Sequence, residues 1–131
     1  MTDRAVTWLF YTCLLALIPA ICRIAVWVIV EDGVQPFATI DLIVFGIVLH
    51  SANINEVNRI SGADRAWKTM HNGISTFFLM IYSLLIFAAI LDDDRVDSAK
   101  LFLVSIAMGL VTFALGVSVI KRANALEGVS R

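Results

Sequence analysis

The fold is decided by residues 50–73, which read HSANINEVNRISGADRAWKTMHNG and form the one long hydrophilic stretch between two strongly apolar halves. Both histidines of the chain lie in this stretch. Of the 131 residues, 60% are hydrophobic and 16% are charged, and the mean hydropathy is +0.87. Soluble domains are roughly 45–50% apolar and about 25% charged. The composition therefore predicts a small membrane protein with a polar middle.

The apolar segments on either side of this stretch are long enough to cross a bilayer. A spanning helix needs about 20 residues, within a range of roughly 17–25. We predict four transmembrane helices at about residues 5–30, 37–57, 68–91 and 99–120. Residues 1–131 are thus expected to form a single all-α membrane domain. The second helix is the least apolar, because Asp41 and His50 interrupt it.

The positive charges beside the predicted helices set the expected orientation. Seven lie at the two termini and in the middle stretch: Arg4, Arg59, Arg65, Lys68, Lys121, Arg122 and Arg131. The other two connections carry Arg95 and Lys100 and are otherwise acidic. Short loops rich in Lys and Arg stay on the cytoplasmic side. We therefore expect a multi-pass protein of the cell (inner) membrane with cytoplasmic N- and C-termini, in which Arg59, Arg65 and Lys68 are cytosolic.

The middle stretch is predicted to be a helical hairpin rather than an irregular loop. Helical spacing of polar and small residues continues in the second helix as far as Val57, beyond its apolar part. Gly62 is a suitable C-cap that ends this helix. Asp64 is a suitable N-cap for a helix that begins at Arg65 and continues into the third span. We expect helices two and three to extend together into the cytosol.

The first helix carries the most costly residue of the sequence, Arg23. An arginine in the middle of a membrane helix costs roughly 2.5–3.5 kcal/mol, so it needs a partner or water. Arg23 and Asp41 lie at similar depth on adjacent helices, which predicts an intramembrane ion pair within one chain or between copies. The alternative is that Asp41 only complements the positive N-terminus of the second helix, while Arg23 reaches the surface alone.

Pro19 lies one turn before Arg23. It removes a backbone hydrogen bond and predicts a kink in the first helix. Proline and arginine inside this segment also argue against a cleaved signal peptide, so we expect the helix to be retained.

A polar cluster is expected at the cytoplasmic mouth of the bundle. Folding of the hairpin about Gly62 sets position 53 opposite position 71 and brings His50, Asn53, His71 and Asn72 to one level. Such a cluster could line a pore mouth, relay protons or bind a small anionic ligand with help from nearby basic residues. The alternative is an ordinary interhelical hydrogen-bond network.

The fourth helix carries a stripe of small residues. Ser105, Gly109, Thr112 and Gly116 recur at helical spacing. In a membrane, such a stripe lets two helices approach closely. The partner helix could belong to the same chain or to another copy.

The sequence lacks the motifs of several classes of function. We expect no enzyme and no cofactor, since there is no nucleophile–base arrangement, phosphate-binding glycine loop or paired-carboxylate motif. Two histidines without a third ligand at recognisable spacing predict no metal site. A net charge of −1 without a basic stripe argues against nucleic acid. Cys13 and Cys22 are expected to be packing residues, and the acidic run 92–97 a solvated cap.

Three classes of function remain. The first is a homo-oligomer with pore- or channel-like activity, either permeabilising the membrane or conducting ions. The stripe on the fourth helix and polar residues at both ends of the span favour it. The alternative is a non-catalytic anchor or subunit of a larger complex, which docks a soluble cytoplasmic partner through residues 53–73. A small transporter is the second alternative. The expected partners in the first case are the lipid bilayer and copies of the chain itself.

Overall fold

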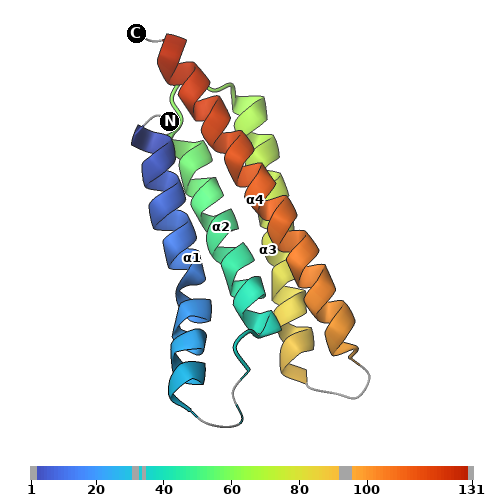
Figure 1. Ribbon diagram of the computed structural model, residues 1–131. Coiled ribbons are helices and arrows are strands. Elements are labelled where there is room, and N and C mark those ends of the chain that lie inside the picture. Colours follow the sequence, from blue (N-terminus) through green and yellow to red (C-terminus); the bar gives the residue numbers. More distant parts are fainter. Residues whose placement is uncertain (1–2, 31–32, 34, 92–95, 130–131) are drawn as a thin grey trace.

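The computed structural model is a bundle of four long helices (Figure 1). It describes residues 3–30, 33, 35–91 and 96–129. The helices are α1 (Asp3–Ile29), α2 (Thr39–Arg59), α3 (Arg65–Leu91) and α4 (Ser98–Val129). All four are long and apolar enough to span a membrane. The predicted all-helical class is confirmed, and so are four helices of the length and apolarity that a membrane span requires.

Helix α2 is the centre of the bundle. It packs against α1, α3 and α4, whereas α4 touches α1 and α3 only lightly. The start of α1, the end of α4 and the connection 60–64 lie at one end of the bundle, which we call the terminal end (Figure 1). The helices α2 and α4 begin at the opposite end. Three helices thus surround one.

This arrangement explains why the least apolar helix is the central one. A polar side chain that faces lipid is costly, whereas one that faces protein finds partners. Helix α2 is the least apolar of the four candidate spans and also the most buried. The outer helices turn large apolar side chains outward, such as Phe10 on α1, Phe77 on α3 and Leu110 on α4, all at least 60% exposed.

The turn between α2 and α3 uses the predicted residues, with one change of role. Helix α2 ends at Arg59, and Ile60 is its C-cap, with its N–H donated to the carbonyl of Glu56 at 3.2 Å. Gly62 is therefore not the cap. It supplies the left-handed conformation of the turn that follows, with φ of +84°, which glycine adopts without steric cost.

The start of α3 follows the prediction. Asp64 Oδ1 accepts the N–H of Trp67 at 2.7 Å, which is the bond made by an N-cap side chain, and the helix begins at Arg65.

Helix α4 continues to Val129, well beyond its predicted end at residue 120. No Gly or Pro follows Ile120 until Gly128, so nothing local stops the helix. The extension is also held by packing. Ala123 of α4 is buried against Val57 and Ile60, and Leu126 and Trp67 cover this cluster. The end of α4 therefore fixes the α2–α3 hairpin to the bundle.

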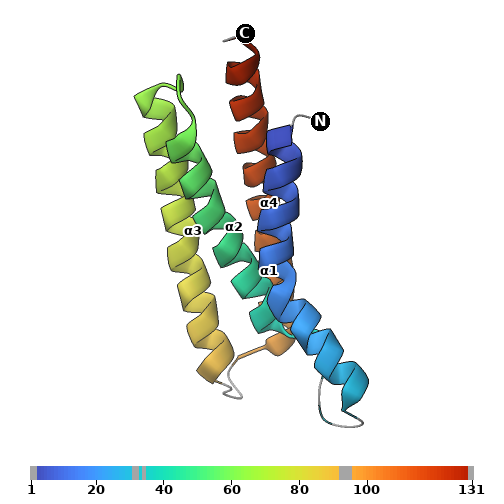
Figure 2. The same ribbon diagram turned by 90° about the vertical axis from the view of Figure 1, so that its left-hand side faces the viewer.

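Helix α1 remains one helix through Pro19 and changes direction midway (Figure 2). Its terminal-end half is anchored by Trp8 and Ala16, which are buried against Leu49 and Ile120.

Candidate functional site

Buried polar side chains follow α2 through the bundle. Those that belong to α2, or face it from α3 and α4, are no more than 8% exposed. We call them the polar seam: Asp41, His50, Asn53, Glu56, Tyr82, Ser105 and Thr112. From Asp41 to Glu56 the helix rises about 22 Å, a large part of an apolar layer about 30 Å thick.

The seam begins with an ion pair near the start of α2. Arg23 Nε donates to Asp41 Oδ2 at 2.6 Å, and the same oxygen accepts the N–H of Ala38 at 3.1 Å. The structure therefore brings Arg23 and Asp41 together within one chain. Asp41 also complements the positive N-terminus of α2, as in the alternative prediction, because its carboxylate accepts a backbone N–H at the first turn of the helix. The two roles are compatible.

The centre of the seam is a hydrogen-bonded group from three helices, which we call the central triad: His50, Thr112 and Tyr82. Thr112 Oγ1 lies 2.9 Å from His50 Nε2 and 2.9 Å from the Tyr82 hydroxyl. It also lies 2.8 Å from the carbonyl oxygen of Met108. A threonine hydroxyl has one proton and two lone pairs, so these three contacts use it fully. The ring of Phe78 covers the imidazole, with centroids 4.9 Å apart.

Gly46 allows the central triad to form. A Cβ at this position would lie 2.1 Å from Cζ of Tyr82 and 2.3 Å from its hydroxyl oxygen. The tyrosine ring thus rests directly on the α2 backbone, where any larger residue would displace it. This contact also leaves no space for a hydrated ion between α2 and α3 at this level.

Three buried side chains next to the triad keep polar atoms without a partner. These atoms are Trp8 Nε1, His50 Nδ1 and both amide atoms of Asn53, which bond to no atom of the described residues. The Trp8 ring edge and Asn53 Oδ1 both lie within 3.0 Å of the place a Gly116 Cβ would take. We call Trp8, His50 and Asn53 the inner polar site. Buried donors and acceptors of this kind bind internal water.

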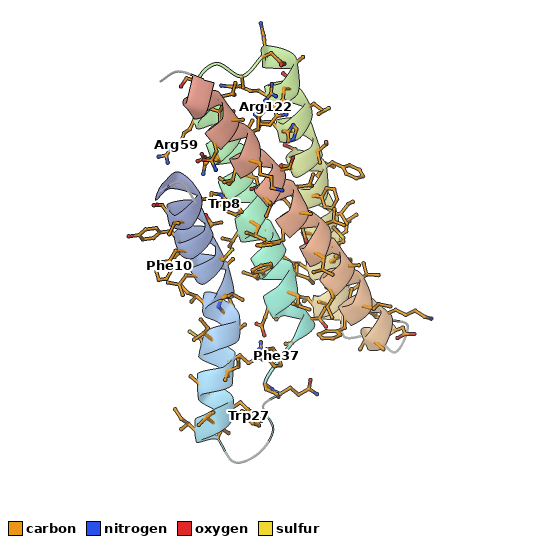
Figure 3. All side chains as sticks on the ribbon, turned by 45° about the horizontal axis from the view of Figure 1, so that its top comes forward. Trp8, Phe10, Trp27, Phe37, Arg59 and Arg122 are labelled. Carbon is orange, nitrogen blue, oxygen red and sulfur yellow. The ribbon has the colours of Figure 1, made fainter. Side chains whose placement is uncertain are left out.

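A groove at the terminal end of the bundle shares Trp8 with the inner polar site. It has a volume of about 630 Å³ between α1 and α2, and Trp8, Tyr11, Glu56 and Arg59 are among its lining residues. Trp8 points into the bundle and Arg59 lies at the terminal end, whereas Phe37 and Trp27 lie toward the opposite end (Figure 3). Trp8 therefore belongs both to the groove and to the inner polar site.

A second cavity lies beside Asp41, at the start of α2. It has a volume of about 250 Å³ between α1, α2 and α4, and Asp41 contributes to its wall. The rest of the wall is apolar, including Leu42, Phe45 and Ile106. Ser105 is buried on the same face of α4 as Thr112, two turns closer to the start of the helix. The seam is therefore interrupted by an apolar segment at this level.

The four residues expected to form one cluster are divided between two places. His50 and Asn53 belong to the seam, whereas His71 stacks on Trp67 with ring centroids 4.2 Å apart. Asn72 Nδ2 donates to Asn58 Oδ1 at 2.8 Å.

The hairpin register explains this separation. Position 72 lies beside position 58, whereas the expected fold about Gly62 sets position 71 opposite position 53. The connection 60–64 rises past the end of α2 before α3 turns back (Figure 1). The expected single cluster is therefore corrected to a buried pair and a separate group at the hairpin.

The stripe on α4 finds its partner within the chain. Ser105 and Thr112 are fully buried, and Gly116 is in contact with Trp8 and Asn53. Gly109 differs, because a Cβ there would meet nothing within 4 Å. The stripe therefore packs mainly on α2, and it no longer argues for contact between copies.

The basic residues of the hairpin lie away from the central triad. Arg59 and Arg65 are exposed, and Lys68 Nζ donates to the carbonyl oxygen of Asn58 at 3.4 Å. The acidic run 92–97 lies largely outside the described residues. Its last member, Asp97, is described: its Oδ1 accepts the N–H of Lys100 at 3.0 Å, at the start of α4.

Three site residues were not predicted from the sequence, although two of them left a signal there. Glu56 follows Asn53 by one turn on α2, so the polar spacing of that helix already includes it. Tyr82 is one of the few polar residues of α3. Trp8 gave no usable signal, because a tryptophan near the end of a membrane helix is usually an interface anchor.

No protein-family model, no curated protein and no solved structure matches this chain. Its class rests on the fold itself. Four helices long and apolar enough to cross a membrane, three of them packed around the least apolar one, α2, are the architecture of a multi-pass helical-bundle membrane protein.

Proposed function

We propose that this protein is a channel-like protein of the cell (inner) membrane that conducts ions along the polar seam. The observation that supports the proposal is the series of buried polar side chains that follows α2 from Asp41 to Glu56. A helix used only for packing gains nothing from His50 Nδ1 and the Asn53 amide, which are buried without a partner among the described residues, since each such atom costs about 1–3 kcal/mol. Ionisable side chains at membrane depth commonly mark ion pathways.

The proposal uses the orientation expected from the charges, with the terminal end in the cytoplasm. The groove beside Trp8 and Glu56 is then a cytoplasmic vestibule, and the Arg23–Asp41 pair lies toward the outer face. The α2–α3 hairpin extends from the membrane on the cytoplasmic side. A topology reporter fused after Arg131 should be active in the cytoplasm; activity only outside the cell would overturn this orientation.

The largely apolar cavity beside Asp41 is the gate in this account. A narrow apolar segment excludes ions until water enters it. Conduction therefore requires hydration of the cavity lined by Leu42, Phe45 and Ile106.

Assembly into a homo-oligomer is a separate part of the proposal. The wide apolar faces of α1 and α3 offer area for contact between copies, and the seam lies within each chain. The number of copies then changes the number of pathways but not the residues that form them. Chemical crosslinking in native membranes tests this part.

Electrical recording from the purified protein in planar bilayers tests the conduction. We expect current above that of protein-free bilayers, and His50→Leu should abolish it because it removes the imidazole from the seam. His71→Leu is the matched control, since His71 lies outside the seam, and it should keep the current. A folded His50→Leu variant with full current would contradict the proposed pathway.

The same preparation distinguishes the two alternatives. Electrical silence, together with co-purification of a soluble protein that is lost when residues 53–73 are altered, would indicate an anchor or subunit. Saturable uptake of a solute without current would indicate a transporter.

A further inference from the structure

We infer that the species conducted along the polar seam is the proton, passed between water at the inner polar site and the central triad. This inference rests on the proposed function, because it names what the same pathway carries.

At the level of the triad, the helices leave no passage for a hydrated ion, but hydrogen bonds connect them. The Tyr82 ring lies against the backbone of Gly46 so closely that even one added carbon would overlap it. A metal ion with its water shell therefore finds no passage there. The hydrogen bonds from Tyr82 through Thr112 to His50 are continuous across the same level, with both links 2.9 Å long. A proton can be transferred along these hydrogen bonds, whereas a hydrated metal ion would need an open passage.

Each member of the triad has an exchangeable proton. Tyrosine and threonine hydroxyls both donate and accept, and an imidazole can take a proton at one nitrogen while it releases one from the other. The other side chain packed on the His50 ring is Phe78, which carries no polar atom. No carboxylate or ammonium group of the described residues is bonded to the triad. Among the described residues, therefore, no ion pair holds the hydrogen bonds of the triad in one direction.

The inner polar site supplies the next step of the pathway. His50 Nδ1 is fully buried and has no partner among the described residues, and Asn53, one helical turn away, contributes a donor and an acceptor that have none there either. Trp8 Nε1 adds a further donor. Groups of this composition hold water molecules in a fixed orientation. Water held there joins His50 to the groove at the terminal end, which Trp8 also lines.

The transfer balances without any other reactant. When the Thr112 hydroxyl turns from the Met108 carbonyl toward His50, Tyr82 donates to Thr112, Thr112 donates to His50 Nε2, and Nδ1 carries a proton. For one inward transfer, the Nδ1 proton moves to water, the Thr112 proton to Nε2 and the Tyr82 proton to Thr112. A proton from water on the outer side then replaces the one that left Tyr82. The Tyr82 and Thr112 oxygens each lose one proton and gain one, whereas His50 loses a proton at Nδ1 and gains one at Nε2. Rotation of the Thr112 hydroxyl toward Met108 and a turn of the imidazole ring, which presents the bare nitrogen to Thr112 and the protonated one to water, reset the triad.

Proteoliposomes containing a trapped pH-sensitive dye test the inference. A potassium gradient with valinomycin drives protons inward, and we expect the wild-type protein to acidify the lumen. Tyr82→Phe and Thr112→Val keep the shape of the side chains but remove the hydroxyls, so both should reduce the flux to that of protein-free liposomes. The controls are Ser83→Ala and Thr76→Val, whose exposed hydroxyls bond only to carbonyls of their own helix in the described residues. Helical circular dichroism shows that each variant is folded.

The outcomes separate this inference from the proposed function. In a second assay, potassium efflux with a protonophore present should equal that of protein-free liposomes. Potassium efflux as fast as proton flux would overturn proton selectivity and leave the channel intact. Full proton flux through a folded Tyr82→Phe or Thr112→Val variant would overturn the role of the triad. Absence of every flux in the wild type would refute the channel and the inference together.

Discussion

His50 Nε2 lies 2.9 Å from Thr112 Oγ1, although 62 residues separate the two in the chain. This contact joins the central helix to α4 in a bundle where α3 and α4 hardly touch. Through the same oxygen it also reaches Tyr82, so a single hydroxyl connects three helices. Stability and the proposed conduction therefore depend on the same group.

Removing the Thr112 hydroxyl should destabilise the bundle. Thr112→Val leaves His50 Nε2 and the Tyr82 hydroxyl without their shared partner, which should cost about 1–3 kcal/mol. Tyr82→Phe should cost less, and the double variant should cost less than the sum of the single variants, because the residues share a bond. Unfolding in mixed micelles by titration with a denaturing detergent measures this. Strict additivity of the two effects would contradict the shared hydrogen bond.

Two glycines should respond in opposite ways to the same substitution. Gly46→Ala drives a methyl group into the Tyr82 ring, so overpacking should cost about 1–3 kcal/mol or more. Gly109→Ala meets nothing within 4 Å and should be neutral or slightly stabilising. The same detergent titration compares them. Equal effects at the two positions would show that the close contact between Gly46 and Tyr82 does not form.

The ion pair on α1 and α2 predicts an order of stability. Asp41→Ala leaves Arg23 without its partner and frees the N–H of Ala38, so we expect a loss near the lower end of about 3–5 kcal/mol. The lower end applies because Arg23 stays 32% exposed. Asp41→Asn keeps an acceptor for Ala38 and should lose less. The pair would be refuted if Asp41→Ala unfolded at the same midpoint as the wild type while Arg23→Ala unfolded at a lower one.

The start of α4 should loosen in acid. The hydrogen bond from the Lys100 backbone N–H, followed by that from the Lys100 side chain, holds the pKa of Asp97 below its ordinary value. A carboxyl with a lowered folded-state pKa stabilises the structure above its ordinary pKa, and this contribution is lost as pH falls through the folded-state value. Protection of the Lys100 amide from hydrogen exchange should therefore fall below about pH 4. In Asp97→Asn, protection that still falls in this range would contradict the assignment.

The sequence predicted the parts of the fold that depend on local chemistry. The four spans follow from the length of the apolar segments, and the start of α3 follows from Asp64. The pairing of Arg23 with Asp41 followed from depth alone, since a charge in a membrane has few places to find a partner. These features need no knowledge of how the helices surround one another.

The remaining site depended on the arrangement of the helices. The register of α3 against α2 is set by how far residues 60–64 rise before α3 turns back. The prediction assumed a shorter turn and therefore placed His71 and Asn72 too close to His50. Thr112 had the spacing of a packing residue, and its hydrogen bond to His50 forms because α2 and α4 lie side by side. Side-chain periodicity identifies a face of a helix but not the partner that this face meets.

The most direct test of the account combines stability and conduction in one variant, Asn53→Leu. Both amide atoms of Asn53 are buried without a partner among the described residues, so an apolar side chain of similar size should leave the bundle as stable as before or more stable. The same change removes the polar groups that hold water beside His50, so current in planar bilayers should be lost. Asn58→Leu, at the hairpin, should keep the current. A folded Asn53→Leu protein that conducts like the wild type would contradict conduction along the polar seam.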